Sequence, residues 1–328
     1  MSKLYHLYFA ACKPEGGIYH YTLKDGNLTF IKKTDISEPM YMDITDNDLE
    51  VVLRRPCMTE NGPVSGLQHY DLVNYELSNP SGIQPTGGRE GCHLCRFEGN
   101  FYVANYSSGS LFSSAGKLVE HEGQGPDPRR QERPHIHYVY PSPDNKYLLS
   151  VDLGLDSVFT YDKDLNEVSV SKVPGGYGCR HLAYSEDGKY VFCANELDAS
   201  VSVFAYDDGK LEYIDTTYMY DTHPIAGNTT GAIRVKGEYV YVTNRSKPGI
   251  TNDITVLKWD KKALTKVNQV PSGGESPRDI FLVDGLLFCT NEYTNNVTIY
   301  KENGAELIKL DEELSMPNPL NVVVLEEK

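Results

Sequence analysis

Short runs in which apolar and polar residues alternate recur along the chain, and turn residues separate them. Between residues 178 and 211, runs at 182–185 and 190–194 are joined by the turn Glu186-Asp187-Gly188-Lys189. A third run, at 200–206, follows and ends in an Asp-Gly turn. A period of two with such turns predicts antiparallel strands joined as a β-meander.

The same pattern returns at regular intervals. In each copy the second run ends in a polar residue, and these residues are Asn105, Asp152, Asn195, Asn244 and Asn291. They are spaced by 47, 43, 49 and 47 residues, a period typical of propellers and arrays. The chain of 328 residues holds about seven such units. We expect an all-β fold, a seven-bladed β-propeller of four-stranded antiparallel blades that forms a single domain over residues 1–328.

The two chain ends complete one blade in this interpretation. Residues 4–12, 17–23 and 28–32 supply only three strands for the first blade, whereas residues 318–325, NPLNVVVL, resemble the first strand of a further blade. We predict that the C-terminal strand completes the first blade, so that the ring closes without an open edge strand.

Two segments interrupt the regular pattern. The second blade is the least regular, and we expect a loop over residues 54–63 between its strands. The polar, proline-containing segment 120–133 leads directly into His135. A long loop in a compact fold is usually functional or flexible, and we expect this one to lie over one mouth of the central channel.

Composition excludes several classes of function. The formal net charge is −15, from 31 basic and 46 acidic residues, which argues against a nucleic-acid partner or an anionic membrane. The N-terminal apolar run is too short for a signal peptide or a membrane span, so we expect a cytoplasmic protein. Seven cysteines, an odd number, indicate reduced thiols. Cys92 and Cys95 have CxxC spacing, but no second pair follows, so no metal or other cofactor is expected.

Topology brings distant residues to one rim of the channel. Because strands in a blade alternate in direction, the start of the innermost strand and the end of the second strand lie on the same face. Strand starts contribute His93, His135, His137, Arg180, His181 and Arg278, and strand ends contribute Asn105, Asp152, Glu196 and Arg245 together with Asn195, Asn244, Asn291 and Glu292. Arginines bind anions and can stabilise an oxyanion, whereas a histidine or a desolvated glutamate can accept a proton from water. This combination favours a hydrolase with an anionic substrate.

Structural roles compete with these functional ones. Each Asn or Asp at a strand end can cap a turn by bonding its own backbone. Arg180 and Glu196 can form a buried structural ion pair, and a single rim histidine is more often a packing residue.

The residues resemble a known family in combination. Arg180-His181-Leu182 is followed by Asn195-Glu196-Leu197, Pro134-His135-x-His137 by Asp152-Leu153-Gly154-x-Asp156, and Val242-x-Asn244-Arg245 comes next. Together they resemble the seven-bladed lactonase family, which includes propeller-type 6-phosphogluconolactonase and carboxy-cis,cis-muconate cyclase. One departure is Gly231-Ala232, where family members often have an acidic residue.

The resemblance implies a set of roles. The family's rim histidine would be His135 or His137, its glutamate Glu196, and its arginines Arg180, Arg245 and Arg278. Combining these with the rim positions, we expect His135, His137, Arg180 and Glu196 to be catalytic, and His93, His181, Arg245, Arg278, Asn105 and Asp152 to bind the substrate. The expected reaction is hydrolysis of 6-phospho-D-glucono-1,5-lactone to 6-phosphogluconate, a step of the pentose phosphate pathway. The expected partner is a small anionic lactone substrate, with no nucleic acid and no membrane. A muconate-type lactonising cycloisomerase and a non-catalytic binding propeller are the alternatives.

Overall fold

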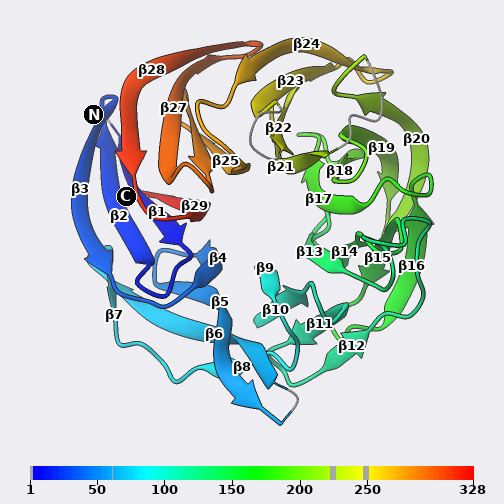
Figure 1. The fold of residues 1–328 in the computed structure, drawn as a ribbon, viewed down its shortest axis with the longest axis horizontal. Helices are drawn as coiled ribbons and strands as arrows, with labels where there is room; N and C mark the ends of the chain where they lie inside the picture. Colours follow the sequence, from blue (N-terminus) through cyan, green and yellow to red (C-terminus); the bar gives the residue numbers. More distant parts are fainter. Residues whose placement is uncertain (1–2, 61, 222–226, 247–250) are drawn as a thin grey trace.

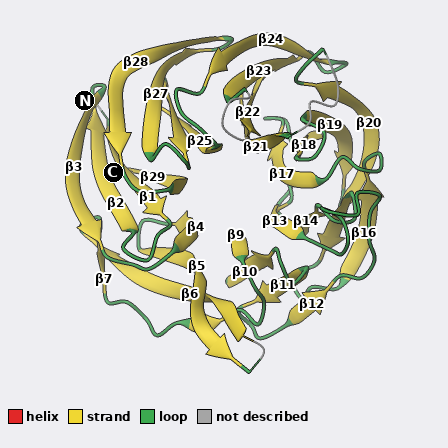
Figure 2. Ribbon diagram, viewed as in Figure 1, coloured by secondary structure: helices red, strands yellow, loops and turns green. Residues whose placement is uncertain are grey.

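A computed structural model describes residues 3–60, 62–221, 227–246 and 251–328. Within these ranges the regular elements are all strands, and seven sheets stand around a central channel (Figure 1, Figure 2). A search of the same residues finds no helix long and apolar enough to cross a membrane.

The blades follow one another around the ring, and in each blade the strand named first below lies at the channel. Blade 1 contains β29 (Pro319–Glu326), β1 (Leu4–Ala11), β2 (Gly17–Lys24) and β3 (Asn27–Thr34). Blade 2 contains β4 (Pro39–Ile44), β5 (Asp48–Thr59), β6 (Gly62–Val73) and β7 (Glu76–Ser78), with β8 (Gln84–Pro85) beside β6. Blade 3 contains β9 (Gly91–Phe97), β10 (Asn100–Asn105), β11 (Ser110–Ser113) and β12 (Leu118–Glu120). Blade 4 contains β13 (Ile136–Pro141), β14 (Leu148–Asp152), β15 (Ser157–Tyr161) and β16 (Glu167–Lys172).

The remaining three blades have the same order from the channel outward. Blade 5 contains β17 (Cys179–Tyr184), β18 (Tyr190–Asn195), β19 (Ser200–Asp207) and β20 (Lys210–Tyr218). Blade 6 contains β21 (Asn228–Lys236), β22 (Tyr239–Ser246), β23 (Asp253–Trp259) and β24 (Leu264–Pro271). Blade 7 contains β25 (Pro277–Val283), β26 (Leu286–Asn291), β27 (Asn296–Asn303) and β28 (Glu306–Ser315). The predicted seven-bladed propeller of antiparallel sheets is confirmed.

Burial changes from the channel to the rim of the ring. The second strands are covered on both faces by neighbouring blades and are almost entirely buried, as in β14 and β26. The outermost strands alternate between exposed and half-buried residues, as in β16. The hydrophobic core is therefore divided into clusters between adjacent blades, such as the one in which Phe9 packs near Phe288. All seven cysteines are free thiols, as predicted.

One predicted loop in blade 2 is in fact a hairpin. Residues 54–59 continue β5, and β6 begins at Gly62, with Cys57 paired to Val64. The expected loop at 54–63 was wrong because a register shift between Leu53 and Cys57 breaks the alternation without ending the strand.

The ring closes by pairing the two ends of the chain, as predicted. β29 runs antiparallel to β1, with Tyr5 opposite Glu326 and Phe9 opposite Val322. The side chains of Phe9 and Val322 are buried in the cluster between blades 1 and 7. The C-terminal strand thus supplies both backbone hydrogen bonds and apolar surface to the first blade.

Deletion of residues 317–328 is expected to abolish cooperative unfolding, because it opens an edge of β1 and exposes the core between blades 1 and 7. Thermal unfolding followed by circular dichroism tests this. Deletion of Lys328 alone, which lies beyond β29, is the control. A truncated protein that melts at the same temperature as the intact chain would show that closure does not stabilise the ring.

Candidate active site

A β-bulge near the start of each innermost strand sets the geometry of the channel mouth. In the pairing of β17 with β18, Cys179 lies opposite Asn195 and His181 opposite Ala194, so Arg180 is left out of the ladder. The other innermost strands skip the equivalent residue, and β21 skips two. The skipped residues are Leu320, Met40, Cys92, His137, Arg180, Gly231 with Ala232, and Arg278, here called the bulge ring. Bulges often redirect side chains beside active sites.

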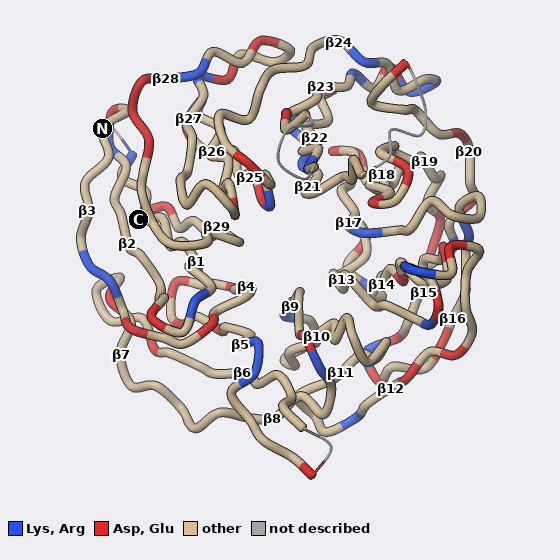
Figure 3. Tube along the Cα trace, viewed as in Figure 1, with Lys and Arg blue, Asp and Glu red and all other residues tan. Residues whose placement is uncertain are grey.

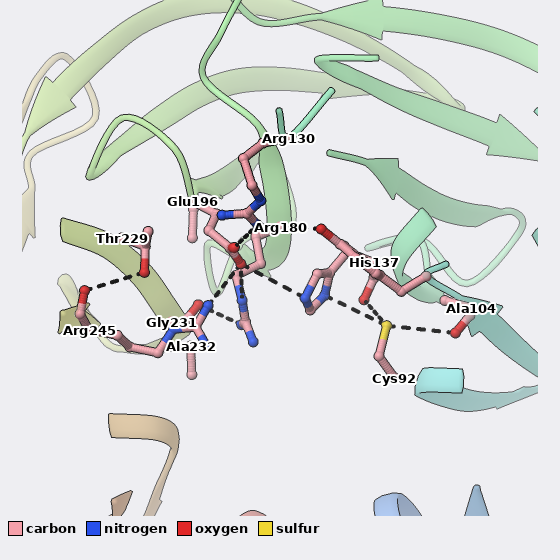
Figure 4. A network of polar contacts seen from close by, with 12 residues as sticks. Cys92, Ala104, Arg130, His137, Arg180, Glu196, Thr229, Gly231, Ala232 and Arg245 are labelled. Atoms are coloured by element: carbon pink, nitrogen blue, oxygen red, sulfur yellow. Dashed lines mark hydrogen bonds and ion pairs between the residues drawn. The ribbon is translucent and has the colours of Figure 1, made fainter. Parts of the chain in front are cut away.

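Glu196 lies at the centre of the polar contacts at the mouth (Figure 4). Its Oε1 accepts a hydrogen bond from Nη2 of Arg130 at 2.5 Å. Its Oε2 accepts one from Nε of Arg180 at 3.0 Å and another from Nη2 of Arg245 at 2.8 Å. His137 Nε2 is 3.9 Å from the same oxygen. One carboxylate therefore holds three guanidinium groups from different parts of the ring.

The absence of a side chain at Gly231 makes this arrangement possible. Arg180, which is only 1% exposed, donates from Nη1 to the Gly231 carbonyl oxygen at 2.7 Å. A Cβ at Gly231 would lie 2.3 Å from Thr243 Oγ1 and 2.6 Å from the Pro277 carbonyl oxygen. The Gly231-Ala232 departure from the family pattern thus has a packing reason in this chain.

A cavity of about 220 Å³ opens beside this cluster. Its walls include four arginines and two carboxylates with His137 and neutral side chains, namely Arg54, Arg130, Arg245, Arg278, Glu90, Glu196, His137, Tyr106, Cys92 and Met40. Arg278 makes no hydrogen bond or ion pair with the residues that the structure describes. The Nε atoms of Arg54 and Arg245 are buried and likewise lack a partner there. The cavity therefore offers cationic donors to an anion.

Burial and the arginines fix the protonation of the site. Burial alone would raise the pKa of the Glu196 carboxyl, but Arg245, Arg130 and Arg180 outweigh it and hold that pKa well below its usual range. Burial, reinforced by Arg180, lowers the pKa of His137 well below its ordinary value. Burial raises the pKa of Cys92 to about 12. At neutral pH the cavity therefore contains a carboxylate, a neutral imidazole and a protonated thiol.

The comparison with known proteins fits this geometry. A family model described as "Lactonase, 7-bladed beta-propeller" matches residues 6–324. The chain belongs to this lactonase family. A relative named 6-phosphogluconolactonase, from Bacillus subtilis, is 30% identical over 286 residues, which are 78% of this chain and 81% of the relative.

Solved structures share the fold of this lactonase-family chain over almost its whole length. A protein from Lactobacillus plantarum is 27% identical with a TM-score of 0.86, and the match covers 99% of this chain and 100% of that one. The periplasmic gluconolactonase of Pseudomonas aeruginosa is 22% identical with a TM-score of 0.84, covering 98% and 99% of the two chains. At that identity the second likeness concerns the fold alone.

Five of the sequence-predicted residues gather at the mouth of this lactonase-family propeller. Glu196, Arg245, His137 and Arg278 line the cavity, and Arg180 lies directly beneath it, against Glu196. Three of the five belong to the bulge ring. The predicted meeting of strand starts and second-strand ends at one face therefore holds for these residues.

His93 and His181 lie deeper in the channel than the predicted rim. His93 follows the bulge residue Cys92, and His181 follows the bulge residue Arg180. Each histidine therefore lies one residue further along its strand, away from the mouth. The His181 ring centroid is 5.3 Å from that of His137 and 5.4 Å from that of His93. The placement at the rim was wrong because the bulge residue alone is turned toward the mouth.

His135 lies beside the cavity rather than in its wall. It precedes β13, stacks on Tyr106 with ring centroids 4.5 Å apart, and lines a neighbouring outer cavity of about 440 Å³. Its Nδ1 atom is 3.2 Å from the Tyr106 carbonyl oxygen.

Asn105 and Asp152 are fully buried and outside the mouth cavity. Asp152 Oδ1 accepts hydrogen bonds from the backbone of His135 and Gly154, and its Oδ2 lies 2.6 Å from His121 Nδ1. Asn105 donates from Nδ2 to Ser110 Oγ on the third strand. The other blades repeat this device, since Asn195, Asn244 and Asn291 donate to Ser or Thr of their own third strands. These contacts are structural. Asp152 caps its own turn through Gly154, whereas the asparagines bond hydroxyls of the third strand rather than the backbone of their own turn.

Two cavity arginines were missed in the sequence. Arg130 lies in segment 120–133, and its contact with Glu196 confirms that this loop reaches the channel mouth. In blade 2, Leu53 pairs with Pro39, just as Asn195 pairs with Cys179 in blade 5. Arg54, the residue after Leu53, is therefore equivalent to Glu196, the residue after Asn195. The signal was present, but the second strand of blade 2 lacks the marker Asn.

The described residues contain no group of three His, Cys, Asp or Glu side chains placed to hold a metal ion. The candidate site accordingly consists of guanidinium groups, carboxylates and an imidazole.

The Gly231→Ala variant is expected to lose about 1–3 kcal/mol of unfolding free energy, the usual cost of overpacking, because its Cβ has no room beside Thr243 and Pro277. Urea unfolding measures this loss. Gly82→Ala is the control, since nothing lies within 4 Å of a Cβ there. Equal stabilities of the two variants would contradict the packing argument.

Proposed function

We propose that this protein hydrolyses 6-phospho-D-glucono-1,5-lactone to 6-phosphogluconate in the cytoplasm, as a step of the pentose phosphate pathway. The observation that carries the proposal is the mouth cavity, in which unpaired arginine donors face a neutral histidine across an ionised carboxylate. Membership of the lactonase family and the 30% identity to a protein named 6-phosphogluconolactonase support the same reaction.

The size and charge of the cavity favour a small anion. Its volume of about 220 Å³ is below the roughly 300–1,000 Å³ of pockets for drug-sized ligands, which suits a single sugar ring. Four wall arginines exceed the two wall carboxylates, Glu90 and Glu196. Arg278 has no described ion-pair partner and is the guanidinium best placed to bind an added anionic group bidentately.

We assign water activation to His137. Glu196 already accepts hydrogen bonds from Arg130, Arg180 and Arg245, so both of its oxygens are engaged and protonation of either would weaken a charge-assisted hydrogen bond. His137 lines the cavity as a neutral imidazole and can accept the proton of an attacking water.

The proposed reaction adds water to the lactone carbonyl. As the water oxygen bonds to carbon, His137 takes its proton and negative charge develops on the carbonyl oxygen. Arg245, whose buried Nε has no partner among the described residues, stabilises this charge, while Arg278 holds the phosphate. The ring C–O bond then breaks, the departing oxygen takes the proton from His137, and the open-chain carboxylic acid that results releases its remaining proton to solvent to give the carboxylate. Arg180 is buried below the cavity and acts as a positioning residue that orients Glu196.

The wild-type protein is expected to open freshly prepared 6-phosphogluconolactone far faster than the spontaneous reaction, at a rate unchanged by a chelator. Coupling the product to its dehydrogenase measures the rate. Arg278→Ala should lower kcat/KM about 10- to 100-fold, the usual loss for a charge-assisted hydrogen bond.

Arg129→Ala, an exposed neighbour in the mouth loop, is the matched control and should retain the wild-type rate. No acceleration by the wild-type protein would reject the lactonase, and turnover of a muconate instead would select the cycloisomerase. Loss of activity on chelation would indicate a metal-dependent enzyme.

The value of kcat/KM is expected to stay constant as the pH falls from 8 to 6, because the lowered pKa keeps His137 unprotonated through the range where a free imidazole titrates. Activity should fall only when the pH reaches the lowered pKa. Phosphorus NMR of the lactone across this range tests the profile. A half-maximal rate near pH 6.5, or a His137→Gln variant that keeps full kcat, would rule out this base.

A further inference from the structure

The channel contains a second cavity at the end opposite the mouth. Its volume is about 480 Å³ and its walls come from the later residues of the innermost strands, within the roughly 300–1,000 Å³ typical of small-molecule sites. A narrow cavity of about 10 Å³ beside Arg180 and His181 lies between the two ends, enough for about one water molecule. The lower cavity is therefore a separate compartment from the mouth cavity.

Aromatic rings form one wall of this lower cavity. His93 lies between two of them, with ring centroids 4.0 Å from Tyr41 and 4.1 Å from Tyr138. Tyr140 is 6.0 Å from Tyr138 and 6.5 Å from Tyr184 by the same measure. The two tyrosine pairs lie within the range of favourable ring contacts, and the two contacts of His93 are closer still. The rings are tilted relative to one another and hold one another in place, so they form a preformed apolar wall on which an aromatic ring can pack.

The charged groups of the lower cavity are paired with other protein groups. Arg234 donates from Nη2 to Asp279 Oδ1 at 2.6 Å and from Nη1 to the Ile233 carbonyl oxygen at 2.9 Å. The Asp43 carboxylate lies 3.7 Å from Arg96 Nε. The mouth cavity has an arginine without such a partner, but the lower cavity offers no comparable charge to an ion.

The polar groups that remain without a partner among the described residues include two phenol hydroxyls and the buried Nδ1 of His93. Tyr138 is 6% exposed, and neither its hydroxyl nor that of Tyr140 makes a hydrogen bond with the described residues. Tyr184, by contrast, donates to the Pro141 carbonyl oxygen at 2.8 Å. Burial raises the pKa of Tyr138 well above its usual value, so its O–H is retained as a donor. The hydroxyls of Tyr138 and Tyr140 are open to the cavity or to solvent, so a ligand can use them as hydrogen-bond donors.

We propose that the lower cavity binds a small, uncharged, flat aromatic molecule that carries a carbonyl or hydroxyl oxygen. The ring of the ligand packs on Tyr138 and Tyr140, and its oxygen accepts a hydrogen bond from the Tyr138 hydroxyl. This site is distinct from the proposed lactone site and does not depend on it.

Coumarin, an uncharged aromatic lactone with a carbonyl oxygen, is a suitable probe for titration calorimetry and saturation-transfer NMR. The wild-type protein is expected to bind one equivalent. Ala183→Trp, which fills the lower cavity from its wall, should abolish binding, whereas Ala115→Trp on an exposed turn should not. Tyr138→Phe keeps the ring, loses the hydroxyl and should weaken binding about fivefold.

Arg278→Ala distinguishes binding in the lower cavity from binding in the mouth cavity. Arg278 lines the mouth cavity and not the lower one, so this variant should bind coumarin with unchanged affinity. Absence of saturable binding to the wild-type protein would overturn the proposal, as would binding that survives Ala183→Trp or is lost in Arg278→Ala. Circular dichroism checks that each variant is folded. If Ala183→Trp does not fold, Tyr138→Phe decides, and an unchanged affinity in that variant would contradict the proposed contact.

Discussion

The β-bulge repeated in every innermost strand is the constraint on which the site depends. It displaces one residue per blade, or two in β21, at the same register position, so that His137, Arg180 and Arg278 face one mouth although they come from three blades. The closing strand takes part directly, because the skipped residue of β29 is Leu320. Closure of the ring is therefore a requirement for the site as well as for stability: an open ring would not hold the seven bulges around a common axis.

Glu196 then determines how the cations at the mouth are used. Burying guanidinium groups is costly unless they are paired, and its carboxylate pairs with Arg130, Arg180 and Arg245 at once. Each of these side chains is thereby fixed in orientation before any ligand arrives, which limits the reorganisation that binding requires. Arg278 is left out of this network, so one well-placed charge remains for a substrate.

The sequence predicts the fold better than it predicts the site. A marker such as Asn195 lies at or near the end of the second strand of blades 3 to 7, and the asparagines among these markers bond the third strand, so the repeat is visible without any contact information. Asn105 was predicted to lie at the rim because it ends a second strand, but its side chain is buried and bonds Ser110 of the third strand. The bulge has no residue signature, because the skipped residues are of different types, such as Leu320, Arg180 and Arg278. The depth of His181 in the channel could therefore not be predicted from the sequence. Arg130 lies in a loop that is not part of the repeat, so the repeat could not predict its contact with Glu196.

The two ends of the channel differ in charge, and this difference sorts ligands. The chain carries a net charge of −15, yet basic positions of β17 and β25 face the channel while acidic positions are frequent around the outside (Figure 3). At physiological ionic strength charges are screened over about 8 Å, so an anion responds mainly to the nearest groups, and at the mouth these are arginines. At the lower end Arg234 is neutralised by Asp279, and an anion gains little there. Uncharged ligands lose nothing by this pairing, because their binding rests on packing and hydrogen bonds. A single channel can therefore hold two compartments with different ligand preferences.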